Sequence, residues 1–381
     1  MNSRVIVVLA AVMASTISGE ATACPFCGAV GQPLAARRDT AAAVAVGEAT
    51  APATLQPDGV MTQPFRLLQC LSGERPLAPG ETVIARVDTA IRGTAAVFFD
   101  RLDQPAGQMA IPADEIQLGY LAAAPAIDQP AAARLRWFAR WLEHPDPLLA
   151  EDAFAEFGAA AFKAVRDAAD ALPAAKMQRW VRDEGIPQQR RGFYGLALGI
   201  VAAADPEKRA ACREPLLQIL SEPADDYRAG FDGILAGVLV ADGVAGLEQL
   251  IALGLLEPAA PPVVKRQMLA VLRFAWESLS EEIPRERVAR GTARLLTSPV
   301  TAAEATVDLA RYRWWEAVDE VAALWTALGD EDPLVRRAVA GYLTACPTPQ
   351  GRVQRETIRR GDAERFDDAV EASALPLLRA P

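Results

Sequence analysis

Residues 329–337 read Gly-Asp-Glu-Asp-Pro-Leu-Val-Arg-Arg and predict the start of an amphipathic helix. An Asp before a helix accepts hydrogen bonds from free backbone N–H groups, worth about 1 kcal/mol, and Pro at the first helical position gives up an N–H that has no partner there. The apolar residues that follow share one face at helical spacing: Val335, Ala338, Val339, Tyr342 and Leu343. The same Asp-Pro-Leu step occurs at 146–148, so the chain is predicted to repeat a helical unit.

Prolines divide the C-terminal two thirds of the chain into segments of helical length. A first helix presents one apolar face made by Leu135, Phe138, Trp141 and Leu142. Prolines that begin later helices are expected at positions 173, 187, 206, 215, 284, 299 and 333 and within 258–262 and 347–349. Helices of ~10–18 residues would give about six hairpins, which is the layout of an α-solenoid.

The preceding region favours strands. Five short segments are rich in β-branched, aromatic or alternating apolar residues, at 42–47, 65–70, 82–87, 95–99 and 116–120. Turn residues separate them, such as Pro79-Gly80, where a fixed φ is followed by a permissive one. Several short strands at this spacing favour a small barrel or sandwich.

A resemblance agrees with this division. Cys24-Pro25-Phe26-Cys27, 43–47, 65–68 and 71–83 resemble the OB-like, netrin-type module of exported proteins, a relative of which occurs in the tissue inhibitors of metalloproteases. Over nearly its full length the chain is similar to an uncharacterised family of exported bacterial proteins that join such a module to HEAT-like repeats. The resemblance implies an architecture and no known activity. The expected fold class is multidomain β plus α: a small OB-like β-barrel at 24–124, followed by a HEAT-like α-solenoid at 125–381.

The first 23 residues are expected to direct export. One positive charge precedes the apolar run 5–14, and Ala21-Thr22-Ala23 offers small residues to a signal peptidase, as in a secretory signal peptide. No later run reaches the ~18 apolar residues of a membrane span. The mature protein is therefore predicted to be secreted or periplasmic, without an integral membrane segment. A cut directly before Cys24 would instead give a lipoprotein, although Ala21 and Pro25 match that signal poorly.

The net charge of the chain indicates which kinds of partner it can bind. The chain carries 49 acidic and 39 basic residues and a net charge of -10. An acidic surface repels phosphate backbones, so nucleic acid is not an expected partner, and a protein or a cell-envelope component is.

Three cysteines support competing hypotheses. Cys24 and Cys27 would form a structural disulfide in an oxidising compartment, with each other or with Cys70 as one partner. The alternative is a redox-active CxxC pair, although no βαβ pattern surrounds it. Zinc or haem fits less well, since there is no second CxxC and Gly28 stands where haem attachment needs His. In the tissue inhibitors of metalloproteases that the module resembles, a processed N-terminal Cys chelates the zinc of the target, which Cys24 could do only if cleavage falls just after Ala23. That family begins Cys-x-Cys, which this chain does not.

No catalytic, metal or cofactor site is predicted. His144 is the only histidine, and nucleophilic catalysis or catalytic zinc ordinarily needs a positioned base or several imidazoles. The function expected is non-catalytic binding by the solenoid surface. Residues of the types enriched at interaction hot spots are the candidate contacts: Arg311, Arg313, Trp314, Trp315, Arg336 and Arg337. Two alternatives stay open. Trp315, Val318, Ala322 and Trp325 share a helical face and would fill the core. Six arginines could line a basic strip on successive helices or would instead pair with surplus acids: Arg285, Arg287, Arg290, Arg294, Arg336 and Arg337.

Overall fold

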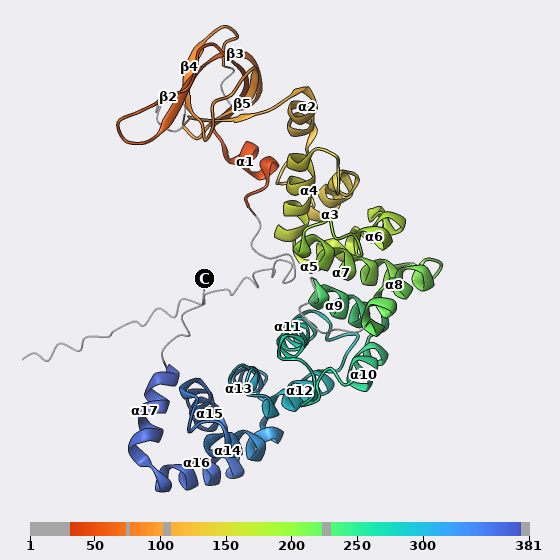
Figure 1. The fold of residues 1–381 in the computed structure, drawn as a ribbon, viewed down its shortest axis with the longest axis vertical. Coiled ribbons are helices and arrows are strands. Elements are labelled where there is room, and N and C mark those ends of the chain that lie inside the picture. Colours follow the sequence, from red (N-terminus) through yellow and green to blue (C-terminus); the bar gives the residue numbers. More distant parts are fainter. Residues whose placement is uncertain (1–30, 74–76, 102–107, 223–229, 375–381) are drawn as a thin grey trace, which may run out of the picture.

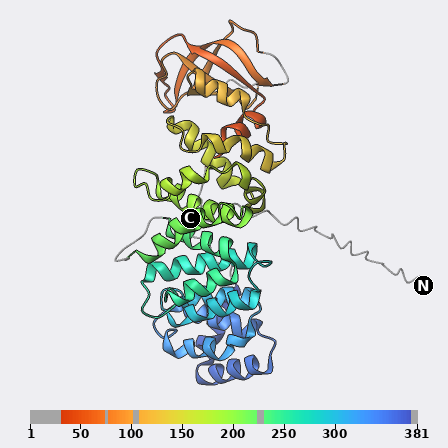
Figure 2. The ribbon, with the colours of Figure 1, turned by 90° about the vertical axis from the view of Figure 1, so that its right-hand side faces the viewer.

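A computed structural model describes residues 31–73, 77–101, 108–222 and 230–374. The predicted signal peptide, Cys24 and Cys27 lie outside these residues. The described chain has two parts, a six-stranded sheet near the N-terminus and a long stack of helices behind it (Figures 1 and 2). This order of β before α is the predicted one, but the β part is a mixed sheet and not the predicted small barrel. No helix of the described residues is both long and apolar enough to cross a membrane.

The N-terminal module is a mixed sheet packed against two helices. Its elements are α1 (Leu34–Thr40), β1 (Ala43–Ala49), β2 (Thr54–Leu55), β3 (Met61–Gly73), β4 (Thr82–Arg86), β5 (Thr94–Phe99), β6 (Gln108–Pro112) and α2 (Glu115–Ala123). The strand order is β1-β5-β6-β4-β3-β2, and β1 also pairs with β3. β4 and β6 share only the parallel pair Arg86 and Met109, so the sheet curls without forming a regular closed barrel.

The sheet buries a different apolar cluster on each side. One includes Ala45, Phe65 and Val97, inside the curl. The other includes Val44 and Phe98, and it is joined by Leu34 beside α1 and by Leu118 and Leu121 of α2. The two helices therefore cover the outer side of the sheet and stand between it and the solenoid.

Four of the five predicted strands are confirmed to within a few residues, and the fifth is wrong. Residues 116–120 lie in α2, where the alternating apolar residues resembled a strand. Asp114 accepts a hydrogen bond from the backbone N–H of Gln117 at 2.8 Å, and the Gln117 side chain accepts one from the backbone N–H of Asp114 at 3.0 Å. This capping box starts a helix and outweighs the period-two pattern. β2, β6 and α1 were not predicted.

The helices of the second part follow one another to the end of the described chain. They are α3 (Ala131–Phe138), α4 (Pro147–Ala159), α5 (Phe162–Asp167), α6 (Ala174–Trp180), α7 (Gln188–Ala204), α8 (Arg209–Ser221), α9 (Phe231–Asp242), α10 (Val244–Ala252), α11 (Pro262–Ser278), α12 (Arg285–Arg294), α13 (Ala302–Arg311), α14 (Val318–Ala327), α15 (Pro333–Ala345), α16 (Pro349–Gly361) and α17 (Ala363–Ala374). Short 3₁₀ turns join several of them.

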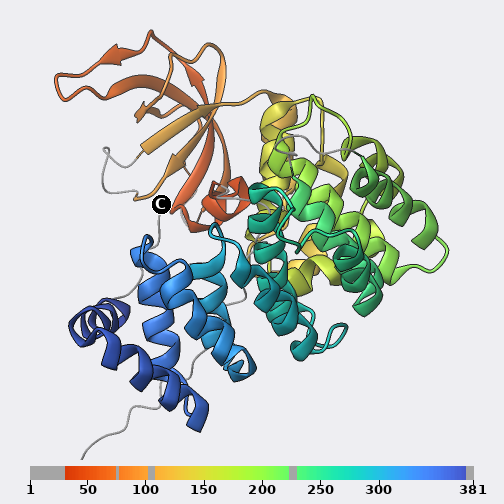
Figure 3. The ribbon, with the colours of Figure 1, turned by 60° about the horizontal axis from the view of Figure 1, so that its bottom comes forward.

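These helices stack in two layers along a curved path. α7 packs on α9 and α9 on α11, while α13 packs on α15 and α15 on α17. α8, α10, α12, α14 and α16 form the outer layer of the arc (Figures 1 and 3). One continuous apolar cluster runs from Ala35 to Ala369, so each layer shares its core with the next. The helical stack predicted from the proline spacing is thus present.

The Asp-Pro-Leu steps act as predicted, and one proline does not. Asp146 accepts a hydrogen bond from the Leu148 N–H at 2.9 Å, and Asp332 accepts one from the Leu334 N–H at 2.8 Å. Pro215, expected to begin a helix, lies inside α8. A proline there costs about 3 kcal/mol. The helix continues because its apolar face, with Cys212 and Leu216 fully buried, packs on α7 and α9.

Candidate functional site

The predicted contact residues Arg311 to Trp315 form the connection between α13 and α14. Arg313 has a φ of +56°, in the left-handed region. Its N–H donates to the Ala310 carbonyl at 3.0 Å, and the Trp314 N–H donates to the Leu309 carbonyl at 2.9 Å. These two bonds are those of a Schellman motif, whose left-handed position is usually glycine because a Cβ is strained there.

The other non-glycine residue with positive φ in the described chain has an evident interior role. Glu143 has a φ of +52°, and its carboxylate accepts a hydrogen bond from the Tyr194 hydroxyl at 2.7 Å and pairs with Arg190 at 3.0 Å. Arg313 differs, because its side chain is exposed and has no hydrogen-bond or ion-pair partner among the described residues. Nothing inside the fold accounts for an arginine at this position.

The strain at Arg313 leads to a stability prediction. Arg313→Gly is expected to raise the free energy of unfolding by about 1 kcal/mol, because glycine adopts the left-handed conformation without a Cβ penalty and no bond is lost. Chemical denaturation of the two proteins measures this difference. Equal or lower stability of the variant would show that the connection is not strained.

Aromatic rings lie on both sides of this connection. Tyr312 stacks on Trp276 of α11 with centroids 3.9 Å apart and an interplanar angle of 16°. The Tyr342 hydroxyl donates to the Trp314 carbonyl at 2.6 Å, and the Tyr342 ring meets Trp315 edge-on at 5.1 Å. All but Tyr342 are partly exposed. Each ring therefore packs on the core and also contributes to the surface.

Both alternatives for the candidate residues hold in part. Val318, Ala322 and Trp325 are buried, as expected for core residues. Trp315 is half-buried beside them. On α12, Arg287 pairs with Glu248 at 3.0 Å and Arg294 pairs with Glu257, which is ordinary charge pairing.

Two further arginines contact rings of the same region. The guanidinium of Arg285 lies 5.1 Å from the Trp276 ring centroid, and that of Arg290 lies 5.9 Å from the Trp314 ring centroid. We call the following set the Arg–Trp cluster: Trp276, Arg285, Arg290, Arg311, Tyr312, Arg313 and Trp314. Its members come from the end of α11, from α12, and from the end of α13 and the connection that follows it. They lie close together only because these helices pack side by side.

A partly buried ion network joins α11 and α13 next to the cluster. Asp308 of α13 is 1% exposed and pairs with Arg273 of α11, which also pairs with Glu304 at 2.8 Å. Burial raises the pKa of the Asp308 carboxyl, and the charge of Arg273 opposes that rise. The Asp308 carboxylate is thus already engaged by Arg273, and Arg311 reaches it only at 3.7 Å.

The remaining predicted contacts lie apart from the cluster. Arg336 donates to the carbonyls of Gly329 and Asp330 and holds the turn that precedes α15. Arg337 is half-buried on the same first turn of that helix. Tyr342 meets Trp314 and Trp315 nearly two turns further along α15. The structure therefore divides the six predicted residues into two groups, of which only Arg311 to Trp315 belong to the cluster region.

The predicted cysteine site cannot be assembled from the described residues. Cys24 and Cys27 lie outside them, and Cys70 on β3 has no disulfide partner within the described ranges. The Cys70 thiol lies 3.3 Å from the Ser72 carbonyl. Cys212 and Cys346 are buried.

His144 has a structural position. Its Nδ1 accepts a hydrogen bond from the Asp146 N–H at 3.1 Å, and its ring packs against Trp141 with centroids 5.1 Å apart. Across the part of the chain that the structure describes, no three His, Cys, Asp or Glu side chains are grouped so that they could hold a metal.

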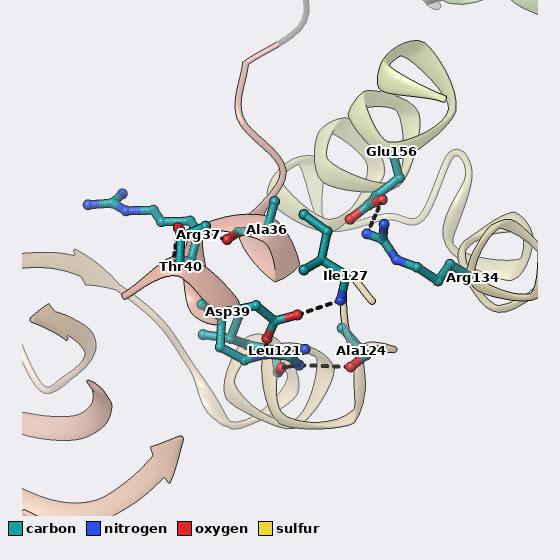
Figure 4. Close-up of polar contacts among 10 residues, drawn as sticks. Ala36, Arg37, Asp39, Thr40, Leu121, Ala124, Ile127, Arg134 and Glu156 are labelled. Atoms are coloured by element: carbon teal, nitrogen blue, oxygen red, sulfur yellow. Dashed lines mark hydrogen bonds and ion pairs between the residues drawn. The ribbon is translucent and has the colours of Figure 1, made fainter. Parts of the chain in front are cut away.

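A second polar cluster, not predicted from the sequence, joins the module to the solenoid. Asp152 of α4 is 6% exposed and accepts hydrogen bonds from the Leu34 N–H and the Tyr120 hydroxyl, both at 2.6 Å. Arg38 of α1 is buried and donates to the carbonyls of Leu121 and Ala124 at 2.7 and 2.8 Å (Figure 4). α1 therefore closes the end of α2 and is itself held by α4.

Glu156 completes this junction. It is 4% exposed and pairs with Arg134 of α3 at 2.6 Å (Figure 4), while its other carboxyl oxygen has no partner among the described residues. Burial raises the pKa of Glu156 to about 7, with Asp152 and Asp39 adding to the rise and Arg134 opposing it. The junction thus contains a carboxyl group whose charge changes near neutral pH.

Glu156→Gln is expected to change how stability depends on pH. Since the folded pKa is about 7 and the ordinary value is 4.5, the folded state binds a proton that the unfolded state lacks between these values. Stability of the wild type therefore falls as pH rises from 4.5 to 7 and levels off above it, by at most about 3 kcal/mol from this group. Gln removes that slope.

Denaturation midpoints between pH 4.5 and 8 measure the effect of Glu156→Gln. Glu151→Gln is the matched control, because Glu151 lies on the exposed side of the same helix. Parallel stability curves for the wild type and Glu156→Gln would contradict the elevated pKa.

The comparisons with known proteins add no relative. No protein-family model matches this chain, and neither a curated protein nor a solved structure matches it.

Proposed function

We propose that this protein is a non-catalytic binding protein that engages a protein partner through the Arg–Trp cluster of its solenoid. The observation that carries the proposal is Arg313, an exposed arginine in the left-handed position of a Schellman motif. Strained residues without a structural role concentrate at functional sites. Arginine, tryptophan and tyrosine are also the residues enriched at binding hot spots.

The form of the molecule supports binding. A stack of helix pairs leaves long curved faces and edges open, because each pair contacts only its neighbours. The single imidazole is occupied, since one His144 nitrogen accepts a backbone hydrogen bond and the ring packs on Trp141. That arrangement favours a structural role for His144 over a role as general base.

The N-terminal module is proposed to be OB-like and to serve as an anchor or a second contact, in a protein that is exported. The curled sheet in which β1 pairs with both β5 and β3 supports the first part. Mass spectrometry of the mature N-terminus tests the second. A mature chain that retains residues 1–23 would contradict export by a cleaved signal. Thiol exchange at Cys24 and Cys27 is the alternative activity, and a rapidly alkylated thiol there would favour it.

Site-specific photo-cross-linking in the native host tests the binding function. A photoreactive amino acid at position 277 is expected to give a discrete protein adduct, because Glu277 is exposed beside Trp276 and its replacement keeps every member of the cluster. The same group at position 266 is expected to give none, since Arg266 is an exposed residue at the opposite end of α11. Equal labelling at both positions, or no adduct at 277, would contradict binding through the cluster.

A further inference from the structure

We propose that the Arg–Trp cluster recognises an acidic peptide segment of its partner, an inference that rests on the proposed binding function.

The arginines of the cluster lack close carboxylates. Arg290 and Arg311 approach Glu316 and Asp308 only at 3.9 and 3.7 Å. Arg285 and Arg313 have no ion-pair partner among the described residues. Some arginines elsewhere on the surface pair closely, such as Arg365 with Asp330 at 2.7 Å, whereas single ones such as Arg86 and Arg266 have no ion-pair partner among the described residues. In a chain with a net charge of -10, four cations without close partners in one region are available to an anionic partner.

Aromatic rings contact two of these cations without taking up their hydrogen-bond donors. The Arg285 guanidinium lies over the Trp276 ring at 5.1 Å from its centroid, and the Arg290 guanidinium lies over the Trp314 ring at 5.9 Å, both within the range of a cation–π contact. The N–H groups of such a guanidinium can still bind a carboxylate with two parallel hydrogen bonds. The partly exposed rings also offer apolar contact to the side chains between successive carboxylates.

The distribution of the cations favours a chain over a single small anion. Arg285 and Arg290 belong to α12, whereas Arg311 ends α13 and Arg313 lies in the connection between α13 and α14. Charges spread over two successive structural units suit an extended segment that carries several carboxylates. Arg313 places an exposed guanidinium at this left-handed position. A glycine there would relieve the backbone strain but would have no side chain to bind a carboxylate.

Fluorescence anisotropy with a labelled hexaglutamate peptide at low salt tests the inference on the full chain. Wild type is expected to bind hexaglutamate, and hexaglutamine at least tenfold more weakly. Arg313→Gly and Arg285→Ala are each expected to weaken hexaglutamate binding about tenfold, while Arg266→Ala is expected to leave it unchanged. Because Arg313→Gly should fold at least as stably as wild type, its loss of binding would not come from unfolding.

Three results would overturn the inference. These are equal binding of hexaglutamate and hexaglutamine, an Arg313→Gly variant that binds as well as wild type, or inorganic tripolyphosphate that binds as tightly as the peptide at the same arginines. If hexaglutamate does not bind while the photo-adduct at position 277 persists, the binding function stands and the acidic chemistry is wrong. Loss of both would reject the binding function as well.

Discussion

Gly199→Ala is expected to destabilise the protein by at least about 4 kcal/mol, although alanine is the better helix former by about 1 kcal/mol. Gly199 of α7 lies against Gly237 of α9, and a Cβ at position 199 would come within 2.1 Å of the Gly237 carbonyl oxygen. The same two helices approach as closely at a second point, where a Cβ at Gly233 of α9 would lie 2.0 Å from the carbonyl oxygen of Gly192 in α7. The two backbones touch, so a methyl group can be accommodated only if the helices separate.

Separation of α7 and α9 would damage the centre of the solenoid. Both helices are buried along most of their length, and α9 also packs on α11. Overpacking a close-packed core usually costs 1–3 kcal/mol, roughly, and here the obstacle is a backbone that has no alternative rotamer.

Chemical denaturation of Gly199→Ala and of the control Gly119→Ala measures the effect. Gly119 is an exposed residue of α2, and a Cβ there would meet no atom within 4 Å. The control is therefore expected to gain up to about 1 kcal/mol from helix propensity. A Gly199→Ala variant as stable as the control would show that α7 and α9 are further apart than described.

Features set by neighbours in the sequence could be predicted. The caps at Asp146 and Asp332 depend on residues two positions away, and the buried face of α15 depends on a regular spacing. These signals gave the helical stack. The same kind of signal was misread at α2, where the capping box of Asp114 and Gln117 was present in the sequence and the alternation of Ile116, Leu118 and Tyr120 was given more weight.

The sites depend on pairs that are distant in sequence. Leu34 and Asp152 are 118 residues apart, and no local pattern shows that an aspartate in the middle of an apolar helix accepts a bond from that backbone. The candidate site was found in part, because Arg and Trp in 311–315 are recognisable by type. Trp276 and Arg285 were not connected with them, since their contacts require α11, α12 and α13 to pack in this order. The left-handed φ of Arg313 also has no sequence signal, because its position is usually glycine.

Asp152→Ala is expected to loosen the N-terminal module from the solenoid at a cost of about 3–5 kcal/mol. The substitution removes both acceptor oxygens, Oδ1 for the Leu34 N–H and Oδ2 for the Tyr120 hydroxyl, and leaves these two donors in a buried environment. Each unsatisfied buried donor costs about 1–3 kcal/mol, and the cavity left by the carboxyl group adds to this. Asp152→Asn should cost less, because its single carbonyl oxygen can still accept one of the two bonds.

Hydrogen exchange resolved by segment separates this local effect from general unfolding. In Asp152→Ala, the amides of α1 and α2 should exchange faster by a factor that corresponds to the lost free energy, while those of α13 and α15 keep the wild-type rate. The reason is that the junction bonds hold α1 between α2 and α4, whereas the C-terminal helices are stabilised by their own layers. Faster exchange in all four helices would mean that module and solenoid unfold as one unit, and unchanged exchange in α1 would mean that Asp152 does not hold it.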